Sequence, residues 1–130
     1  MSNEATHGDS NPSYILGTKV TTLYKAMQLS TDRNEVELAI ADSDYVIGIS
    51  QQTTSQDDEA VQLKRNGYTL ASVGTGDWTK GAKLTPEAGG SLIVTTTAAD
   101  LVCAIAMEIA TDGEFGEVLL LPYSLRYDSF

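Results

Sequence analysis

Hydrophobic and polar residues alternate along most of the chain after residue 20, which is the pattern of half-buried β-strands. In the first such segment, residues 20–29, Leu23, Met27 and Leu29 share one face. Turn residues follow, and a second alternating segment covers residues 36–40, so the two predict a hairpin. Further strands are predicted over residues 45–49, 60–63, 68–73, 92–97, 101–110 and 118–121.

Glycine and proline mark the places where these predicted strands bend or turn. Gly48 indicates a point where another backbone approaches closely or the strand bulges. Asn66 and Gly67 form the dipeptide typical of a tight hairpin, so residues 60–63 and 68–73 are predicted to pair. Pro122 limits the chain after residues 118–121 to a sheet edge or a bulge.

The most apolar segment, residues 101–110, has two faces of different size. Its odd positions carry the large side chains Leu101, Cys103, Ile105, Met107 and Ile109, whereas its even positions are mostly alanine. A helix is an alternative, since alanine, methionine and glutamate favour helices. A period of two in side-chain size favours a strand whose small face packs tightly against a neighbour.

Eight or nine short strands with frequent turns and no long helix predict an all-β fold, either a small antiparallel β-barrel or a sandwich. Residues 1–17 are poor in apolar residues until Tyr14, Ile15 and Leu16, and we expect them to form a flexible N-terminal arm. Residues 18–130 are expected to form a single β-barrel domain that ends in an aromatic C-terminal tail.

Charge and hydropathy exclude several classes of function. Eighteen acidic and eight basic residues give a net charge of -10, which repels a phosphate backbone, so we expect no nucleic-acid binding. No segment approaches the roughly 20 apolar residues of a membrane helix, and the N-terminal residues lack the pattern of an export signal. We therefore expect a soluble protein with no membrane contact.

The sequence offers little for catalysis, metals or cofactors. Cys103 is the one cysteine, so no internal disulfide can form, and its apolar surroundings favour a buried thiol over a nucleophile. The one histidine, His7, has no paired ligand. Residues 57–59 lack the spacing of a calcium loop, and residues 74–77 lack the lysine of a phosphate loop. Acid–base catalysis would need a pair of such groups in a cleft, and Glu108 is the one carboxylate expected to point inward. We therefore expect no enzyme, metal or cofactor.

Several segments, in their order along the chain, carry a resemblance to a known family. They are residues 25–29, 45–49, 58–63, 66–67, 78–85, 89–90, 103–110 and 116–121. Together they resemble the small β-barrel decoration, or cement, proteins that coat tailed-phage heads. This resemblance implies a structural virion protein on the outer capsid surface. It would bind the major capsid protein, associate with itself as a homotrimer, and stabilise the contacts between capsid subunits.

Apolar and aromatic residues outside the predicted strand cores are candidates for partner contacts. They are Tyr14, Ile15 and Leu16 in the arm, Trp78, and Tyr123, Tyr127 and Phe130 in the tail. For Trp78 a position inside the barrel is an equally good alternative. A surface adhesin whose loops bind glycans through Trp78 or the tail tyrosines is the alternative function.

Overall fold

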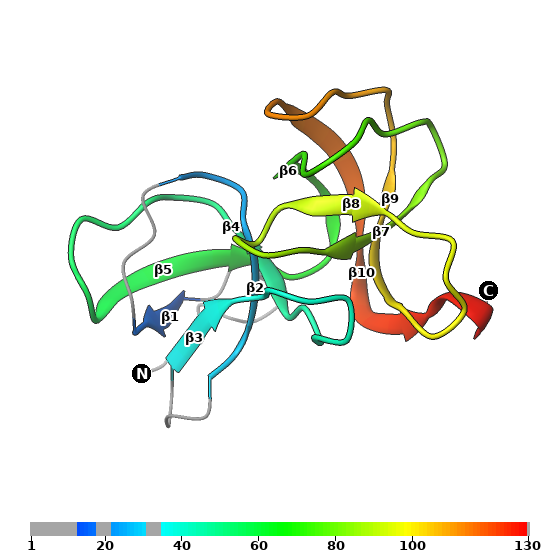
Figure 1. The fold of residues 1–130 in the computed structure, drawn as a ribbon. Coiled ribbons are helices and arrows are strands. Elements are labelled where there is room, and N and C mark those ends of the chain that lie inside the picture. Colours follow the sequence, from blue (N-terminus) through cyan, green and yellow to red (C-terminus); the bar gives the residue numbers. More distant parts are fainter. Residues whose placement is uncertain (1–12, 18–21, 31–34, 130) are drawn as a thin grey trace.

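The structure, a computed structural model, describes residues 13–17, 22–30 and 35–129. Over these residues the chain is all-β, as predicted, apart from the single 3-10 turn η2 near the C-terminus (Figure 1). The elements are β1 Ser13–Leu16, β2 Ala26–Leu29, β3 Glu35–Leu38, β4 Gly48–Ser50, β5 Glu59–Lys64, β6 Gly67–Ser72, β7 Lys83–Pro86, β8 Leu92–Val94, β9 Leu101–Ala106, β10 Phe115–Arg126 and η2 Tyr127–Ser129.

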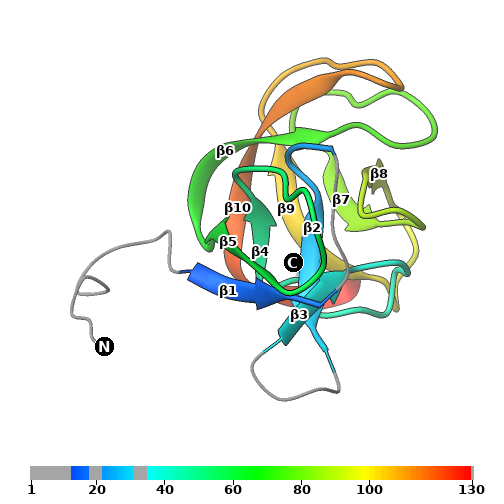
Figure 2. The same cartoon turned by 90° about the vertical axis from the view of Figure 1, so that its left-hand side faces the viewer.

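The first five strands form a closed barrel in the order β1-β3-β2-β4-β5, which faces the viewer in Figure 2. The predicted hairpin is confirmed, because β2 pairs antiparallel with β3 and places Gln28 opposite Glu37. β1 closes the barrel by pairing antiparallel with β5. It also pairs parallel with β3. The prediction of an antiparallel barrel is therefore wrong for this one pair of strands.

The other five strands form an open antiparallel sheet in the order β6-β10-β9-β7-β8. The long strand β10 pairs with β6 on one side and with β9 on the other. Its register against β9 shifts between Leu120 and Leu125, an interval that contains Pro122. The irregularity predicted at this proline is therefore confirmed.

Several of the predicted strands are shorter in the structure than in the sequence pattern. The strand predicted over residues 92–97 ends at Val94, and the one predicted over residues 101–110 ends at Ala106. The strand predicted over residues 20–29 begins at Ala26, because the backbone of Tyr24 lies in the left-handed region at φ 59° and breaks the extended chain. The strand predicted over residues 45–49 begins at Gly48. Just before it, Val46 donates its N–H to the Ser124 hydroxyl at 3.1 Å, instead of to a neighbouring strand.

The predicted hairpin at Asn66 and Gly67 is wrong. Gly67 does adopt a positive φ of 86°, as a tight turn requires. However, β5 belongs to the barrel and β6 to the open sheet, so the turn carries the chain from one sheet to the other.

The boundary of the predicted arm also differs from the structure. Ser13–Leu16 is a barrel strand, and the Leu16 side chain is completely buried beside Val61 and Leu63. The arm therefore cannot extend to residue 17. Its remaining part, residues 1–12, lies outside the described residues.

The main hydrophobic core lies where the two sheets meet. It combines Ala26 and Ile49 of the barrel with Leu84 and other residues of the open sheet, and with Trp78 from the segment between β6 and β7. The small face of β9 belongs to this core, where Ala104 and Ala106 are buried, as predicted from the alternation of side-chain size.

A polar cluster also joins the two sheets. The Lys25 ammonium, at the start of β2, donates hydrogen bonds to the Ser91 hydroxyl at 2.8 Å and to the Ser72 hydroxyl at 3.2 Å. The two serine hydroxyls lie 3.0 Å apart. Burial lowers the pKa of Lys25, and the nearby Glu87 carboxylate partly opposes that shift. The cluster fixes the barrel against β6 and the loop before β8.

Candidate partner-binding surface

The outer face of the open sheet carries a row of apolar side chains that runs across three strands. Tyr68 of β6 lies opposite Leu119 of β10, and Leu119 lies opposite Ile105 of β9. Directly opposite residues in an antiparallel sheet project from the same face. The row ends at Lys83 of β7, which lies opposite Ile105. Tyr68 is 60% exposed, and Ile105 and Leu119 are half-buried.

A second residue of β6 extends this apolar surface. Leu70 projects beside Tyr68 on β6, lies opposite Glu117, and is 38% exposed. We call Tyr68, Leu70, Ile105 and Leu119 the outer stripe. The solvent face of an antiparallel sheet is normally polar. We therefore treat the outer stripe as the candidate partner-binding surface.

Cationic and aromatic groups lie at the β7 end of the outer stripe. The Lys83 ammonium is 5.2 Å from the centre of the Tyr127 ring, a cation–π contact. Arg126 forms an ion pair with Asp128 at 3.0 Å, and both side chains are about half exposed. The contact between Lys83 and Tyr127 joins η2 to β7.

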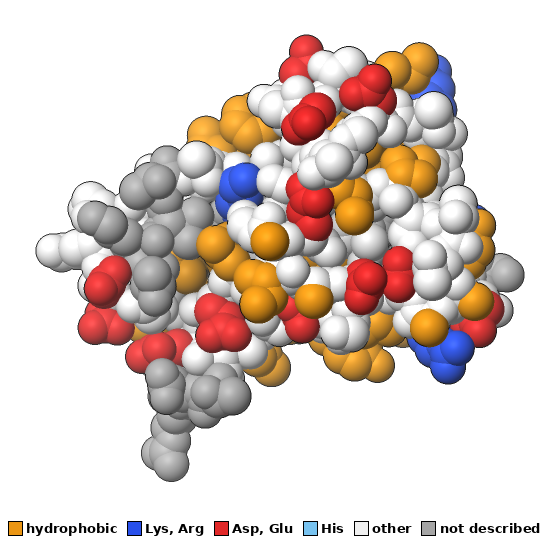
Figure 3. Space-filling view, in the orientation of Figure 1, with side chains coloured by type: hydrophobic (Ala, Val, Ile, Leu, Met, Phe, Trp, Pro, Cys, Tyr) orange, Lys and Arg blue, Asp and Glu red, His pale blue; other side chains and the backbone are white. Residues whose placement is uncertain are grey.

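Acidic side chains are spread over the surface instead of gathering at one place. The face in Figure 3 carries acidic groups over both the barrel and the open sheet, with basic groups at few positions. This distribution agrees with the net charge of -10. Within the described part of the chain, no three His, Cys, Asp or Glu side chains come together in a way that could hold a metal ion.

The structure places two of the sequence-predicted contact residues in the interior. Trp78 is fully buried, and its indole N–H donates to the Leu92 carbonyl at 3.0 Å. Leu16 is fully buried in the barrel. Neither side chain reaches the surface where a partner could touch it, so the prediction of a contact role for these two residues is corrected.

The other predicted contact residues are more accessible, and Tyr127 lies at the β7 end of the outer stripe through its contact with Lys83. Tyr14 is half-buried against the barrel core, and Ile15 is 37% exposed. Tyr123 lies in the irregular part of β10 and is 63% exposed, whereas Tyr127 is half-buried under Lys83. Phe130 lies outside the described residues.

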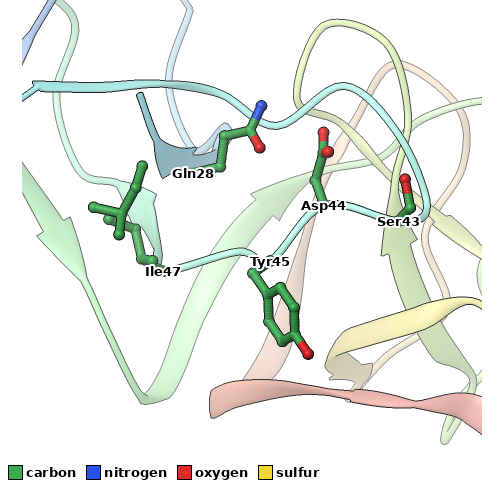
Figure 4. Close-up of a pocket in the computed structure, with 6 residues that line it drawn as sticks. Gln28, Ser43, Asp44, Tyr45 and Ile47 are labelled. Carbon is green, nitrogen blue, oxygen red and sulfur yellow. The ribbon is translucent and has the colours of Figure 1, made fainter. Parts of the chain in front are cut away.

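A shallow hollow of about 250 Å³ lies on the barrel (Figure 4). It is lined by Gln28, Leu29, Ser43, Asp44, Tyr45 and Ile47. The Gln28 amide donates to Glu37, and the Asp44 carboxylate accepts the N–H groups of Ile40 and Ala41. Figure 4 shows the Tyr45 ring pointing away from both groups. These hydrogen bonds fix the Gln28 and Asp44 side chains within the barrel.

The candidate catalytic groups are arranged unfavourably for chemistry. Cys103 is buried, as predicted, and burial raises the pKa of its thiol to about 12. The expectation that Glu108 points inward is wrong, because this residue is exposed and its carboxylate accepts the Glu117 N–H at 2.7 Å. The reason is that β9 ends at Ala106, before the alternation reaches residue 108. Among the described residues, no helix has the length and hydropathy to cross a membrane.

Sequence reasoning missed the outer stripe, although a signal for it exists. Residues 118–121 are apolar without interruption, and so are residues 101–107. A strand that is apolar on both faces is normally covered on both faces. One face of these two strands supplies residues of the core. The apolar residues on the other face indicate that a second layer covers that face as well.

The fold is that of an all-β protein in which a closed five-stranded barrel shares its core with an open five-stranded sheet. This architecture is similar to the crystal structure of the N base of the head fiber gp8.5 in bacteriophage phi29, with a TM-score of 0.68. The similarity covers 88% of this chain and 96% of that chain at 17% sequence identity, so it establishes a shared fold. No protein-family model matches the sequence, and no curated protein matches it significantly.

Proposed function

We propose that this protein is a structural component of a tailed-phage virion. It attaches to the outer surface of the icosahedral head, binds the major capsid protein and stabilises the contacts between capsid subunits. It acts by binding alone, without catalysis, and we expect it to attach as a homotrimer.

The observation that carries this proposal is the fold similarity to a phage head fiber base, which extends over nearly the whole of both chains. The order of the sequence segments independently resembles the decoration proteins of phage heads. Both comparisons concern proteins of the phage head. A function on the outer surface of that head therefore accounts for the two of them together.

The outer stripe supplies a physical means of attachment. Burying the exposed parts of Tyr68 and Leu70 against a capsid subunit stabilises the complex by about 25 cal/mol per Å² of apolar surface. Each contact is small, but a protein that bridges neighbouring subunits at many equivalent positions adds these contacts multivalently. The net charge of -10 keeps free copies apart before they reach the head.

Co-sedimentation with undecorated heads of the phage that encodes this protein tests the proposal. We expect the protein to pellet with the heads in a saturable manner, at a stoichiometry that matches the head symmetry. Absence from the pellet at saturating concentration would reject attachment to the head.

A matched pair of variants tests the role of the outer stripe. Tyr68→Ser removes an exposed aromatic ring from the stripe, whereas Leu29→Ser removes a side chain of similar exposure, 64%, from the barrel. We expect Tyr68→Ser to weaken head binding and Leu29→Ser to leave it unchanged, with both variants folded. Equal binding by the two variants would exclude the outer stripe as the contact surface.

A further inference from the structure

Strand β6 is an edge strand with one open hydrogen-bonding side. Ser72 donates its N–H to the Tyr24 carbonyl at 2.9 Å, away from β10, whereas Val73 donates to the Glu114 carbonyl at 2.9 Å, on the β10 side. Backbone groups of alternate residues in a strand point the same way. The N–H and C=O groups of Tyr68 and Leu70 therefore point away from β10.

These four backbone groups have no backbone partner among the described residues. β6 pairs with β10 alone, and the hydrogen bond from Ser72 to Tyr24 covers only its last residue. Side chains make two polar contacts at this stretch: the Thr69 hydroxyl lies 3.2 Å from the Leu70 carbonyl oxygen, and the Gln51 amide donates to the Thr69 hydroxyl at 3.1 Å. Within residues 67–70, the open edge is thus formed by the backbone groups of Tyr68 and Leu70.

The opposite edge of the sheet, the three-residue strand β8, is covered at Leu92. β8 is bridged in parallel by Val73, and the Leu92 carbonyl accepts both the Gly74 N–H at 2.8 Å and the Trp78 indole N–H. The barrel has no edge, because β1 pairs with β5. The open edge of β6 therefore differs from the other strand borders, and unprotected edges are templates for strand addition.

The side chains around the open edge define what kind of chain fits it. Tyr68 and Leu70 project from it on the outer face, so apolar residues at alternate positions of an added strand would pack against them. Two cationic residues, Lys64 and Arg65, precede the edge. The salt bridge found among the described residues joins Arg126 to Asp128 and does not involve either of them. A carboxylate at that end of an added strand would complement the two cations.

We propose that the open edge of β6 binds an extended segment of the major capsid protein as an added β-strand. The segment has apolar side chains at alternate positions and an acidic residue beside Lys64 and Arg65. This inference rests on the proposed function, and it specifies the partner segment and the mode of binding.

A second copy of this chain fits the edge less well than a capsid segment. Four residues of strand pairing bury far less than the roughly 800 Å² per partner of a stable complex. On the head, a short pairing suffices because many attachment points act together.

Leu70→Pro tests the backbone contribution, since the Leu70 N–H points to the open side and proline removes it without breaking a bond to β10. Leu70→Ala is the matched control, because it shortens the same side chain and keeps the N–H. We expect Leu70→Pro to bind undecorated heads about tenfold more weakly than Leu70→Ala. A melting curve by circular dichroism establishes that both variants are folded.

Hydrogen exchange on the unmodified protein provides a test that needs no variant. We expect the amides of Tyr68 and Leu70 to exchange slowly when the protein is bound to heads and quickly when it is free. If the unmodified protein binds heads but these amides stay unprotected, or if Leu70→Pro binds as well as Leu70→Ala, strand addition is overturned while head attachment stands.

Two other outcomes also overturn the inference. Failure of the unmodified protein to bind heads removes the proposed function, and strand addition falls with it. Analytical ultracentrifugation gives the remaining outcome. If Leu70→Pro converts a free oligomer into monomers and Leu70→Ala does not, the edge is occupied by a second copy and not by a capsid segment.

Discussion

The packing of Gly116 against Trp78 makes a sharp prediction about the core. A Cβ atom at position 116 would lie 2.7 Å from Cζ3 of Trp78 and 2.8 Å from Cβ of Ala110. Gly116 is not among the glycines with positive φ, so its requirement is steric and not conformational. We therefore predict that Gly116→Ala destabilises the protein through overpacking.

The size of the effect depends on whether the neighbours can move. Trp78 is fixed at two points: its backbone N–H donates to the Ala110 carbonyl at 2.8 Å, and its indole N–H donates to Leu92 at 3.0 Å. Overpacking a rigid core costs about 1–3 kcal/mol, and we expect the upper half of that range.

Urea unfolding measures this cost, and the fluorescence of Trp78, the one tryptophan in the chain, reports on the site itself. Trp78→Phe removes part of the indole and makes room, so Gly116→Ala should cost at least about 1 kcal/mol less in that background. Because the Trp78→Phe background contains no tryptophan, its unfolding is followed by circular dichroism. Gly76 is the control, because it has a positive φ of 86° and a Cβ added to it would meet no atom within 4 Å, so its replacement by alanine should show no coupling to Trp78.

Two results would refute this account of the core. One is a free energy of unfolding for Gly116→Ala within about 0.5 kcal/mol of the unmodified protein, which is the range of an ordinary surface substitution. The other is an equal cost of Gly116→Ala in the Trp78 and Phe backgrounds, since a steric clash must depend on the side chain that causes it.

Two further predictions follow from the pKa shifts. Burial raises the pKa of the Cys103 thiol to about 12, so iodoacetamide at neutral pH should modify it only as fast as the protein opens; rapid alkylation of native protein would contradict this. Burial lowers the pKa of Lys25 below its ordinary 10.5, so the unfolded chain keeps this proton to higher pH than the folded chain. The Lys25 contribution should therefore raise stability as pH increases through the lowered pKa toward 10.5. Urea midpoints that rise less with pH in Lys25→Met would support it, and identical pH profiles would exclude it.

Features that depend on neighbours in sequence could be predicted well. The pairing of β2 with β3 and the irregularity at Pro122 followed from alternation and proline chemistry. The close approach expected at Gly48 is also confirmed, because a Cβ there would lie 2.8 Å from the Lys64 carbonyl oxygen. Each of these depends on local backbone geometry, which short sequence patterns encode.

Features that depend on the choice of a distant partner could not be predicted in the same way. Asn66 and Gly67 determine the shape of a turn, but they do not determine whether the strands on either side pair with each other. Here the flanking strands pair with β1 and β4 in the barrel and with β10 in the open sheet. The same limit applies to Trp78, whose burial depends on the Leu92 carbonyl fourteen residues away in the chain.

The candidate surface shows why alternation alone does not locate an interface. A period of two assigns residues to a face, but it does not say whether a layer of the same chain covers that face. Along β9 the large face changes from buried at Leu101 and Cys103 to half-buried at Ile105. The part of the chain that covers this face therefore ends between Cys103 and Ile105. Beyond that point, the row from Ile105 through Leu119 to Tyr68 crosses the sheet and becomes more exposed toward Tyr68. An apolar face that is covered only in part by its own chain is where a second protein can complete the layer.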